Sequence, residues 1–118
     1  MQTSGLNHIV LTVSNTEQSR AFYSDLLGFP VTLIEEDPDK SFFFPSRWPT
    51  PNDRFSEFRL GLDHLSFTAP SKEALYGLAE KLIAAGVDTK GVEQFIYTGN
   101  WSVAFRDPDN IQLEYWLP

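Results

Sequence analysis

The chain has 118 residues, of which 42% are hydrophobic and 14% aromatic, and its formal net charge is −7. This length and composition predict one folded domain over residues 1–118 and exclude a disordered chain. An acidic surface repels phosphate backbones, so nucleic acid is not expected as a partner. The sequence has no apolar run of the ~18 residues that a membrane span needs and no signal-peptide pattern, which favours a cytoplasmic protein without a membrane partner.

The two halves of the sequence resemble each other. When the sequence is slid along itself so that His8 falls on His64, four other identical pairs align: Leu6 with Leu62, Thr12 with Thr68, Glu17 with Glu73 and Leu26 with Leu82. Each half begins with an apolar, strand-like run and continues with a capped amphipathic helix, a glycine and further strands. The repeat predicts two modules within one domain, at about 5–60 and 61–118.

In the first half, residues 6–13 are rich in β-branched and apolar residues and predict a strand. Ser14 and Glu17 have the spacing of a capping box, which predicts a helix over 17–28 that stops at Gly28. Residues 29–36 and 41–46 predict two more strands, separated by a turn at 37–40. The proline-containing stretch 45–60 is interpreted as an ordered loop that joins the halves.

In the second half, residues 62–69 predict a strand and Ser71 predicts the cap of a helix over 72–86. The apolar face of that helix is expected to comprise Ala74, Leu75, Leu78, Leu82 and Ile83. A strand is expected at 92–98, and a hairpin is expected from 101–106 and 111–116 around the turn "DPDN", where Asn110 tolerates a left-handed backbone. The fold class is therefore α+β.

Side chains alternate between the two faces of a strand, which puts His8, His64 and Glu114 on the faces directed away from the helices. Two imidazoles and one carboxylate can hold a divalent cation and leave positions open for substrate or water. Because the chain has no cysteine, any metal must use such nitrogen and oxygen ligands. The alternative for each histidine is an ordinary hydrogen-bonded structural role.

The stretches "GLNHIVLTVSNTEQSRAFYSDLLGF", "LDHLSFTAPS" and "FRDPDNIQLEYW" resemble the vicinal oxygen chelate superfamily, which includes glyoxalase I, extradiol dioxygenases, fosfomycin-resistance thiol transferases and bleomycin-resistance proteins. The resemblance implies paired βαβββ modules that form a curved mixed sheet around a cleft, with the helices on the outer face. It also implies a homodimer and a divalent metal ion (Fe, Mn, Ni, Co or Zn) held by His8, His64 and Glu114.

The sequence departs from some members of the superfamily. A fourth glyoxalase ligand would fall near residues 44–46, "FPS", where no carboxylate or histidine stands. Fosfomycin transferases have a threonine two residues after the first histidine, where this chain has Val10. The pattern is therefore closer to members that use two histidines and one carboxylate.

By resemblance, Tyr97, Thr98, Trp101 and Arg106 are the candidate substrate-binding residues. For Arg106 the alternative is a salt bridge to Asp107 or Glu114, and for Tyr97 it is an ordinary loop position. Several aromatic side chains are candidates for a drug-binding groove or, alternatively, for core or dimer-interface positions: Trp48, Phe55, Phe58, Trp101 and Trp116.

Three functions remain open at this point. The first is a metal-dependent lyase, isomerase or dioxygenase that acts on a small substrate whose adjacent oxygens chelate the ion. The second is a metal-free protein that binds a small molecule, such as an antibiotic. The third is a small dimeric regulator or accessory subunit with a degenerate site. Resemblance of scaffold does not choose among these chemistries.

Overall fold

The computed structural model describes residues 2–3, 5–6, 8–30 and 49–118. A short α-helix, α1 (Thr16–Arg20), continues directly into a π-helical segment, η1 (Ala21–Leu26). Then follow β1 (Leu65–Thr68), α2 (Lys72–Ala84), β2 (Thr89–Gln94), β3 (Trp101–Arg106) and β4 (Gln112–Leu117). Within this described part, neither helix has the length and apolarity required to cross a bilayer.

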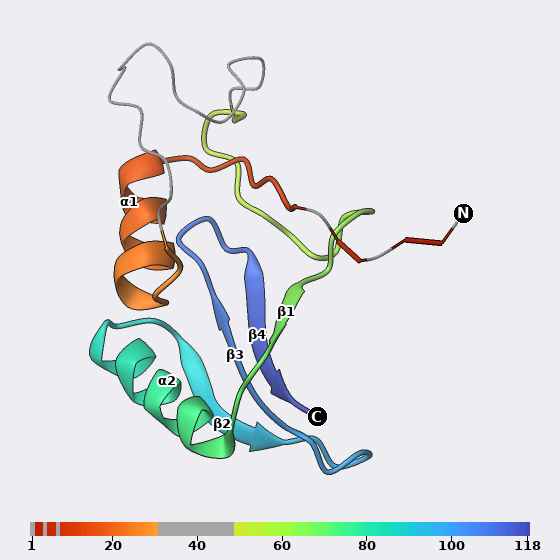
Figure 1. Ribbon diagram of the computed structural model, residues 1–118. Coiled ribbons are helices and arrows are strands. Elements are labelled where there is room, and N and C mark those ends of the chain that lie inside the picture. Colours follow the sequence, from red (N-terminus) through yellow and green to blue (C-terminus); the bar gives the residue numbers. More distant parts are fainter. Residues whose placement is uncertain (1, 4, 7, 31–48) are drawn as a thin grey trace.

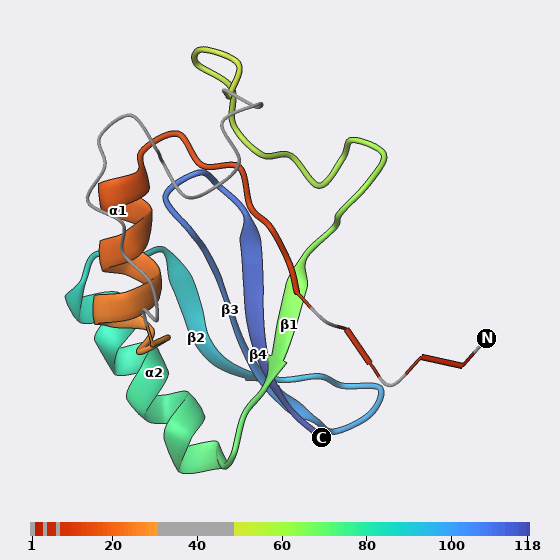
Figure 2. The ribbon, with the colours of Figure 1, turned by 45° about the horizontal axis from the view of Figure 1, so that its top comes forward.

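The four strands form one open mixed sheet in the order β1-β4-β3-β2. β1 runs parallel to β4, whereas β3 is antiparallel to both of its neighbours. The two helical segments lie on the same side of the sheet, as both ribbon views show (Figures 1 and 2). This arrangement confirms the predicted α+β class and the position of the helices on one face.

The core lies between the sheet and the helices. Its fully buried side chains are Leu75 and Leu82 from α2, Val103 from β3 and Leu113 from β4. Phe22 from η1 packs into the same cluster. Because β3 and β4 pair Val103 with Tyr115 and Phe105 with Leu113, the apolar alternate positions face the helices, as the sequence pattern predicts.

The second helix forms as expected. The Ser71 side chain accepts a 3.1 Å hydrogen bond from the Ala74 N–H, and Gly86 follows the helix with φ +73°. Two residues of the predicted apolar face, Ala74 and Ile83, are exposed instead. Ile83 is 63% exposed, because its position, about 100° further around the helix than Leu82, points away from the sheet.

The predicted first strand is not observed. Residues 8–13 form no strand, although the sequence favoured one over 6–13. A strand is defined by ladder hydrogen bonds, and this segment has none within the described residues. The turn at 37–40, the strand at 41–46 and most of the strand at 29–36 fall outside the described residues.

Two other boundaries differ from expectation. The helix cap is Asn15 rather than Ser14: the Asn15 side chain accepts a 2.9 Å bond from the Gln18 N–H. The strand expected at 92–98 begins earlier, at Thr89, and ends at Gln94. A turn follows instead, in which the Gly99 N–H donates to the Phe95 carbonyl at 2.7 Å.

Candidate functional site

Two of the predicted metal ligands belong to the region of the paired strands β1 and β4: Glu114 lies in β4 and His64 directly before β1. Glu114 stands directly opposite Ser66, whose hydroxyl donates a 2.7 Å hydrogen bond to Glu114 Oε1. His64 immediately precedes β1 and is two residues from Ser66, so side-chain alternation gives it the same side of the sheet. The two side chains therefore share the face that is directed away from the helices.

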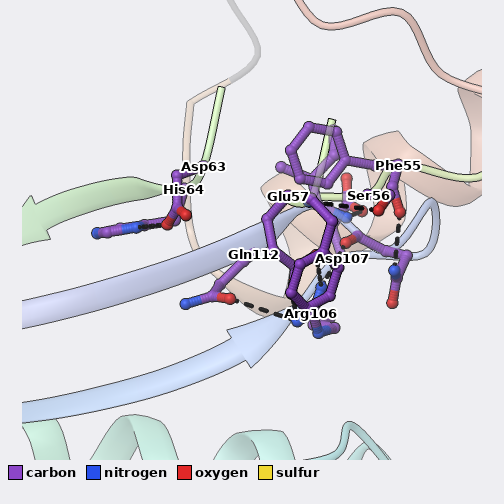
Figure 3. Close-up of polar contacts among 11 residues, drawn as sticks. Phe55, Ser56, Glu57, Asp63, His64, Arg106, Asp107 and Gln112 are labelled. Atoms are coloured by element: carbon purple, nitrogen blue, oxygen red, sulfur yellow. Dashed lines mark hydrogen bonds and ion pairs between the residues drawn. The ribbon is translucent and has the colours of Figure 1, made fainter. Parts of the chain in front are cut away.

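His64 has a carboxylate partner. Its ring Nδ1 lies 2.5 Å from Asp63 Oδ1, and the side chain of His64 is 38% exposed (Figure 3). The Asp63 side chain is itself largely exposed. The imidazole of His64 is thus accessible and is held at one nitrogen by its neighbour in sequence.

His8 lies on the exposed segment before α1 and is not grouped with the other two ligands. Among residues 8–30 and 49–118, with the few described residues before them, no group of three or more His, Cys, Asp or Glu side chains is arranged to hold a metal ion. His64 and Glu114 have the donor atoms and the common face that a divalent ion requires. Within the described chain, the third ligand is not brought to them.

Arg106 is engaged by a residue that the sequence analysis did not consider (Figure 3). Its Nη2 lies 2.5 Å from Glu57 Oε1 and its Nη1 lies 3.2 Å from Glu57 Oε2, a bidentate pair. The guanidinium also donates to the Asn110 carbonyl at 3.0 Å and to Gln112 Oε1 at 3.3 Å. Neither Asp107 nor Glu114, the partners that the sequence offered as the alternative to a substrate, takes this place.

This ion pair changes the acidity of both groups. The hydrogen bonds from Arg106 hold the pKa of Glu57 below its usual range, and the bond to Glu57 raises the pKa of Arg106.

Glu57 belongs to a loop segment whose backbone is also attached to the turn 107–110. The Phe55 N–H donates to the Asp109 carbonyl at 3.0 Å, and the Asn110 side chain donates to the Phe55 carbonyl at 2.9 Å.

The predicted turn "DPDN" is present, and Asn110 has φ +73° as expected. Its first residue, Asp107, is 5% exposed and was missed as a structural anchor. Asp107 Oδ1 accepts from the Ile111 N–H at 2.8 Å and from the Asp109 N–H at 2.9 Å. Burial raises the pKa of Asp107. The tendency of aspartate to bond its own turn was the signal available in the sequence.

The other candidate substrate residues are divided between the two faces. Tyr97 is 82% exposed, and its ring is 5.4 Å from that of Phe95, which in turn lies 5.9 Å from Trp116. The Thr98 hydroxyl accepts from the Asn100 N–H at 3.4 Å, within the same turn. Trp101 instead faces the helices, where Lys72 Nζ lies 3.4 Å from its ring centroid.

Trp48 and the stretch 44–46 lie outside the described residues.

A groove of about 330 Å³ is found on the helix side of the sheet, lined mainly by Leu26, Leu27, Leu75, Leu78 and Tyr115. This groove is remote from His64 and Glu114, which face the other way, and it is therefore not the candidate site.

Comparison with known proteins agrees with the fold. A sequence relative, YwkD of Bacillus subtilis (strain 168), is 31% identical over 98% of both chains. The metallothiol transferase FosB of Shouchella clausii (strain KSM-K16) is 28% identical over 94% of this chain and 78% of its own. A solved glyoxylase/bleomycin resistance protein/dioxygenase domain from Frankia sp. EAN1pec superposes with a TM-score of 0.76, at 29% identity over 98% of each chain. The profile of the Glyoxalase/Bleomycin resistance protein/Dioxygenase superfamily matches residues 5–115, and the chain belongs to that superfamily.

Proposed function

We propose that the protein is a divalent-metal-dependent enzyme of the glyoxalase or dioxygenase type, which acts on a small substrate with adjacent oxygens. His64 and Glu114 are two of its ligands, and His8 is the third. The observation that carries the proposal is the placement of an imidazole and a carboxylate on the common face of the paired strands β1 and β4. The name of the FosB relative, a metallothiol transferase, is in keeping with it.

For His8 to be the third ligand, its side chain must be brought to His64 and Glu114. In the described chain His8 lies on a segment that is not part of the sheet, and it is not clustered with His64 and Glu114. We therefore propose that the protein is a homodimer. His8 reaches the site in one of two ways: its own segment closes onto the sheet, or the His8 of the second copy enters the site. An ion bound there would polarise the substrate oxygens and stabilise the anion that forms on them.

The chain's own residues would bind and orient the substrate. Tyr97 and Thr98 stand on the turn before β3, and Arg106 lies on the same face as Glu114, since β3 pairs Ala104 with Glu114 and Arg106 with Gln112. A substrate anion would compete with Glu57 for the Arg106 guanidinium. Because Trp101 faces the helices, its part in the site is limited to holding the start of β3.

Elemental analysis of the purified protein tests this proposal. We expect one Fe, Mn, Ni, Co or Zn ion per site, lost in each of three variants, His8→Ala, His64→Ala and Glu114→Ala. Glu93→Ala is the matched control, because Glu93 is an exposed carboxylate that pairs with Ser102 on the same face of the sheet. Failure of the wild-type protein to bind any of these ions under loading would disprove the enzyme hypothesis.

A second candidate function is metal-free binding of an aromatic small molecule. It is favoured by the row of rings formed by Tyr97, Phe95 and Trp116, of which Tyr97 and Phe95 are exposed. Exposed aromatic rings are suited to stacking with a planar ligand. In chelator-treated protein, quenching of tryptophan fluorescence by a bleomycin-type drug would support this function, provided that Trp116→Ala abolishes the quenching.

A further inference from the structure

We propose that Asp63 and Ser66 are the positioning residues of the site: Asp63 fixes the tautomer and ring orientation of His64, and Ser66 fixes the carboxylate of Glu114. This inference rests on the proposed function for the role of His64 and Glu114 as ligands. The contacts themselves do not depend on it. Both positioning residues come from the same short stretch, since Asp63 precedes His64 and Ser66 follows it by two positions.

Asp63 acts on His64 through one hydrogen bond. The carboxylate accepts and does not donate, so the 2.5 Å contact between Asp63 Oδ1 and His64 Nδ1 requires the proton on Nδ1. In a neutral imidazole the lone pair then remains on Nε2. A histidine that binds an ion through Nε2 needs this tautomer, and a carboxylate on the other ring nitrogen is the usual means of selecting it.

Ser66 acts on Glu114 from the neighbouring strand. β1 and β4 pair the two residues in register, and the Ser66 hydroxyl donates to Glu114 Oε1 at 2.7 Å. This bond restricts rotation of the carboxylate about its last torsion. It leaves Oε2, which accepts no hydrogen bond from the described part of the chain, as the oxygen available to an ion.

An exposed hydrogen bond between sequence neighbours contributes little to stability, so stability alone does not require the Asp63–His64 contact. If Asp63 were only a solvated surface residue, its removal would leave both the tautomer of His64 and the affinity for metal unchanged. If Asp63 positions the ligand, both properties change while the fold persists. The two interpretations therefore predict different results.

The first measurement uses the metal-free protein. The chain contains two histidines, so ¹⁵N NMR of the side-chain nitrogens resolves His64 with His8 as an internal reference. At a pH where imidazole is neutral, we expect His64 to carry its proton on Nδ1 in the wild type. Asp63→Ala should shift it to the Nε2–H form that free side chains favour, and Asp63→Asn, which keeps an acceptor oxygen, should restore part of the preference. An Nε2–H form in the wild type, or no change in Asp63→Ala, overturns the role of Asp63.

The second measurement is metal affinity by competition with a chromophoric chelator, with Zn²⁺ or Ni²⁺ as the probe. We expect binding to weaken by about 10–100-fold in both Asp63→Ala and Ser66→Ala, at an unchanged thermal midpoint. Asp53→Ala is the control, because it removes another exposed carboxylate with an ion-pair partner, Arg59. Equal affinity in all variants overturns the proposal. If the wild type binds no metal, the proposed function fails, and the tautomer measurement alone decides the role of Asp63.

Discussion

The Tyr23 hydroxyl donates a 2.7 Å hydrogen bond to Asp107 Oδ2, and this contact joins η1 to the turn between β3 and β4. The other oxygen of Asp107 holds the backbone of that turn through Asp109 and Ile111. A buried carboxylate that lies one residue from Arg106 thus links η1 to this turn, in addition to the Glu57–Arg106 pair. Burial raises the pKa of this carboxyl, so its contribution to stability is expected to depend on pH.

Tyr23→Phe should destabilise the protein by about 1–2 kcal/mol, because it leaves a buried carboxylate oxygen without its donor. Equilibrium unfolding in urea measures the change. Tyr76→Phe is the matched control, since Tyr76 is 48% exposed on α2 and should change the free energy of unfolding by less than about 0.5 kcal/mol. Equal effects of the two substitutions would contradict the anchoring role of Tyr23.

The free energy of unfolding of the Asp107→Asn variant should increase relative to that of the wild type as the pH rises. Burial raises the pKa of Asp107 in the folded chain above the value of about 3.9 expected when unfolded. Its contribution to stability is therefore complete below the unfolded pKa and is lost as the pH rises through the folded pKa. The amide does not titrate, and its oxygen can still accept from Asp109 and Ile111.

Urea unfolding of both proteins at intervals between about pH 4 and pH 7 tests this prediction. The difference in unfolding free energy, variant minus wild type, should increase across that range. Asp88→Asn, an exposed position before β2, is the control. A difference that stays constant or falls with pH would show that Asp107 ionises in the folded state at least as readily as it does in the unfolded chain.

Leu82→Ala should cost about 2–5 kcal/mol, because Leu82 is 0% exposed and its truncation leaves a cavity between α2 and the sheet. Its neighbour Ile83 is 63% exposed, so Ile83→Ala should have a small effect, within about 0.5 kcal/mol. Thermal or urea unfolding compares the two. A large loss in the second variant would indicate that a partner covers Ile83 in solution.

Glu57→Gln should loosen the segment 55–57 from the turn 107–110. The ion pair with Arg106 is lost, and the Phe55 N–H, which donates to the Asp109 carbonyl, should exchange with solvent faster. Because the folded pKa of Glu57 is lowered, the contribution of the wild-type pair is present above the unfolded pKa and lost as the pH falls through the folded one.

Hydrogen–deuterium exchange followed by NMR gives the readout for this segment. Arg59→Ala is the control: it removes the exposed pair with Asp53, six residues away, and should leave the exchange of the Phe55 amide unchanged. Unaltered exchange in Glu57→Gln would mean that backbone bonds alone hold the segment. The same variant should bind small anions at Arg106 more readily, which isothermal calorimetry with inorganic phosphate would detect.

The sequence predicts the second half well because its signals are local. Alternation of apolar residues gives the buried faces of β3 and β4, and Ser71 and Gly86 mark the ends of α2 through cap geometry that involves only near neighbours. The family resemblance names His64 and Glu114 as metal ligands, which stays a prediction, and the parallel pairing of β1 with β4 gives them a common face.

The contacts that the sequence does not predict are long-range. Glu57 and Arg106 are 49 residues apart, and Tyr23 and Asp107 are 84 apart, so neither pair leaves a periodic pattern. Two acidic residues, Asp107 and Glu114, are closer to Arg106 in sequence, yet Arg106 forms its ion pair with Glu57. Similarly, apolar composition at 6–13 favours a strand, but strand formation also needs a ladder partner, and residues 8–13 have none among the residues that the structure describes.

The order of the sheet has a consequence for how the molecule is made. β4 is the last strand in the sequence, yet it lies between β1 and β3. While the nascent polypeptide has emerged from the ribosome only as far as Arg106, β4 with Glu114 is still enclosed in the exit tunnel, and β1 lacks the neighbour that it has in the described sheet. Chaperone protection of β1 would matter most until β4 emerges, while the exposed backbone of β1 can pair with other chains.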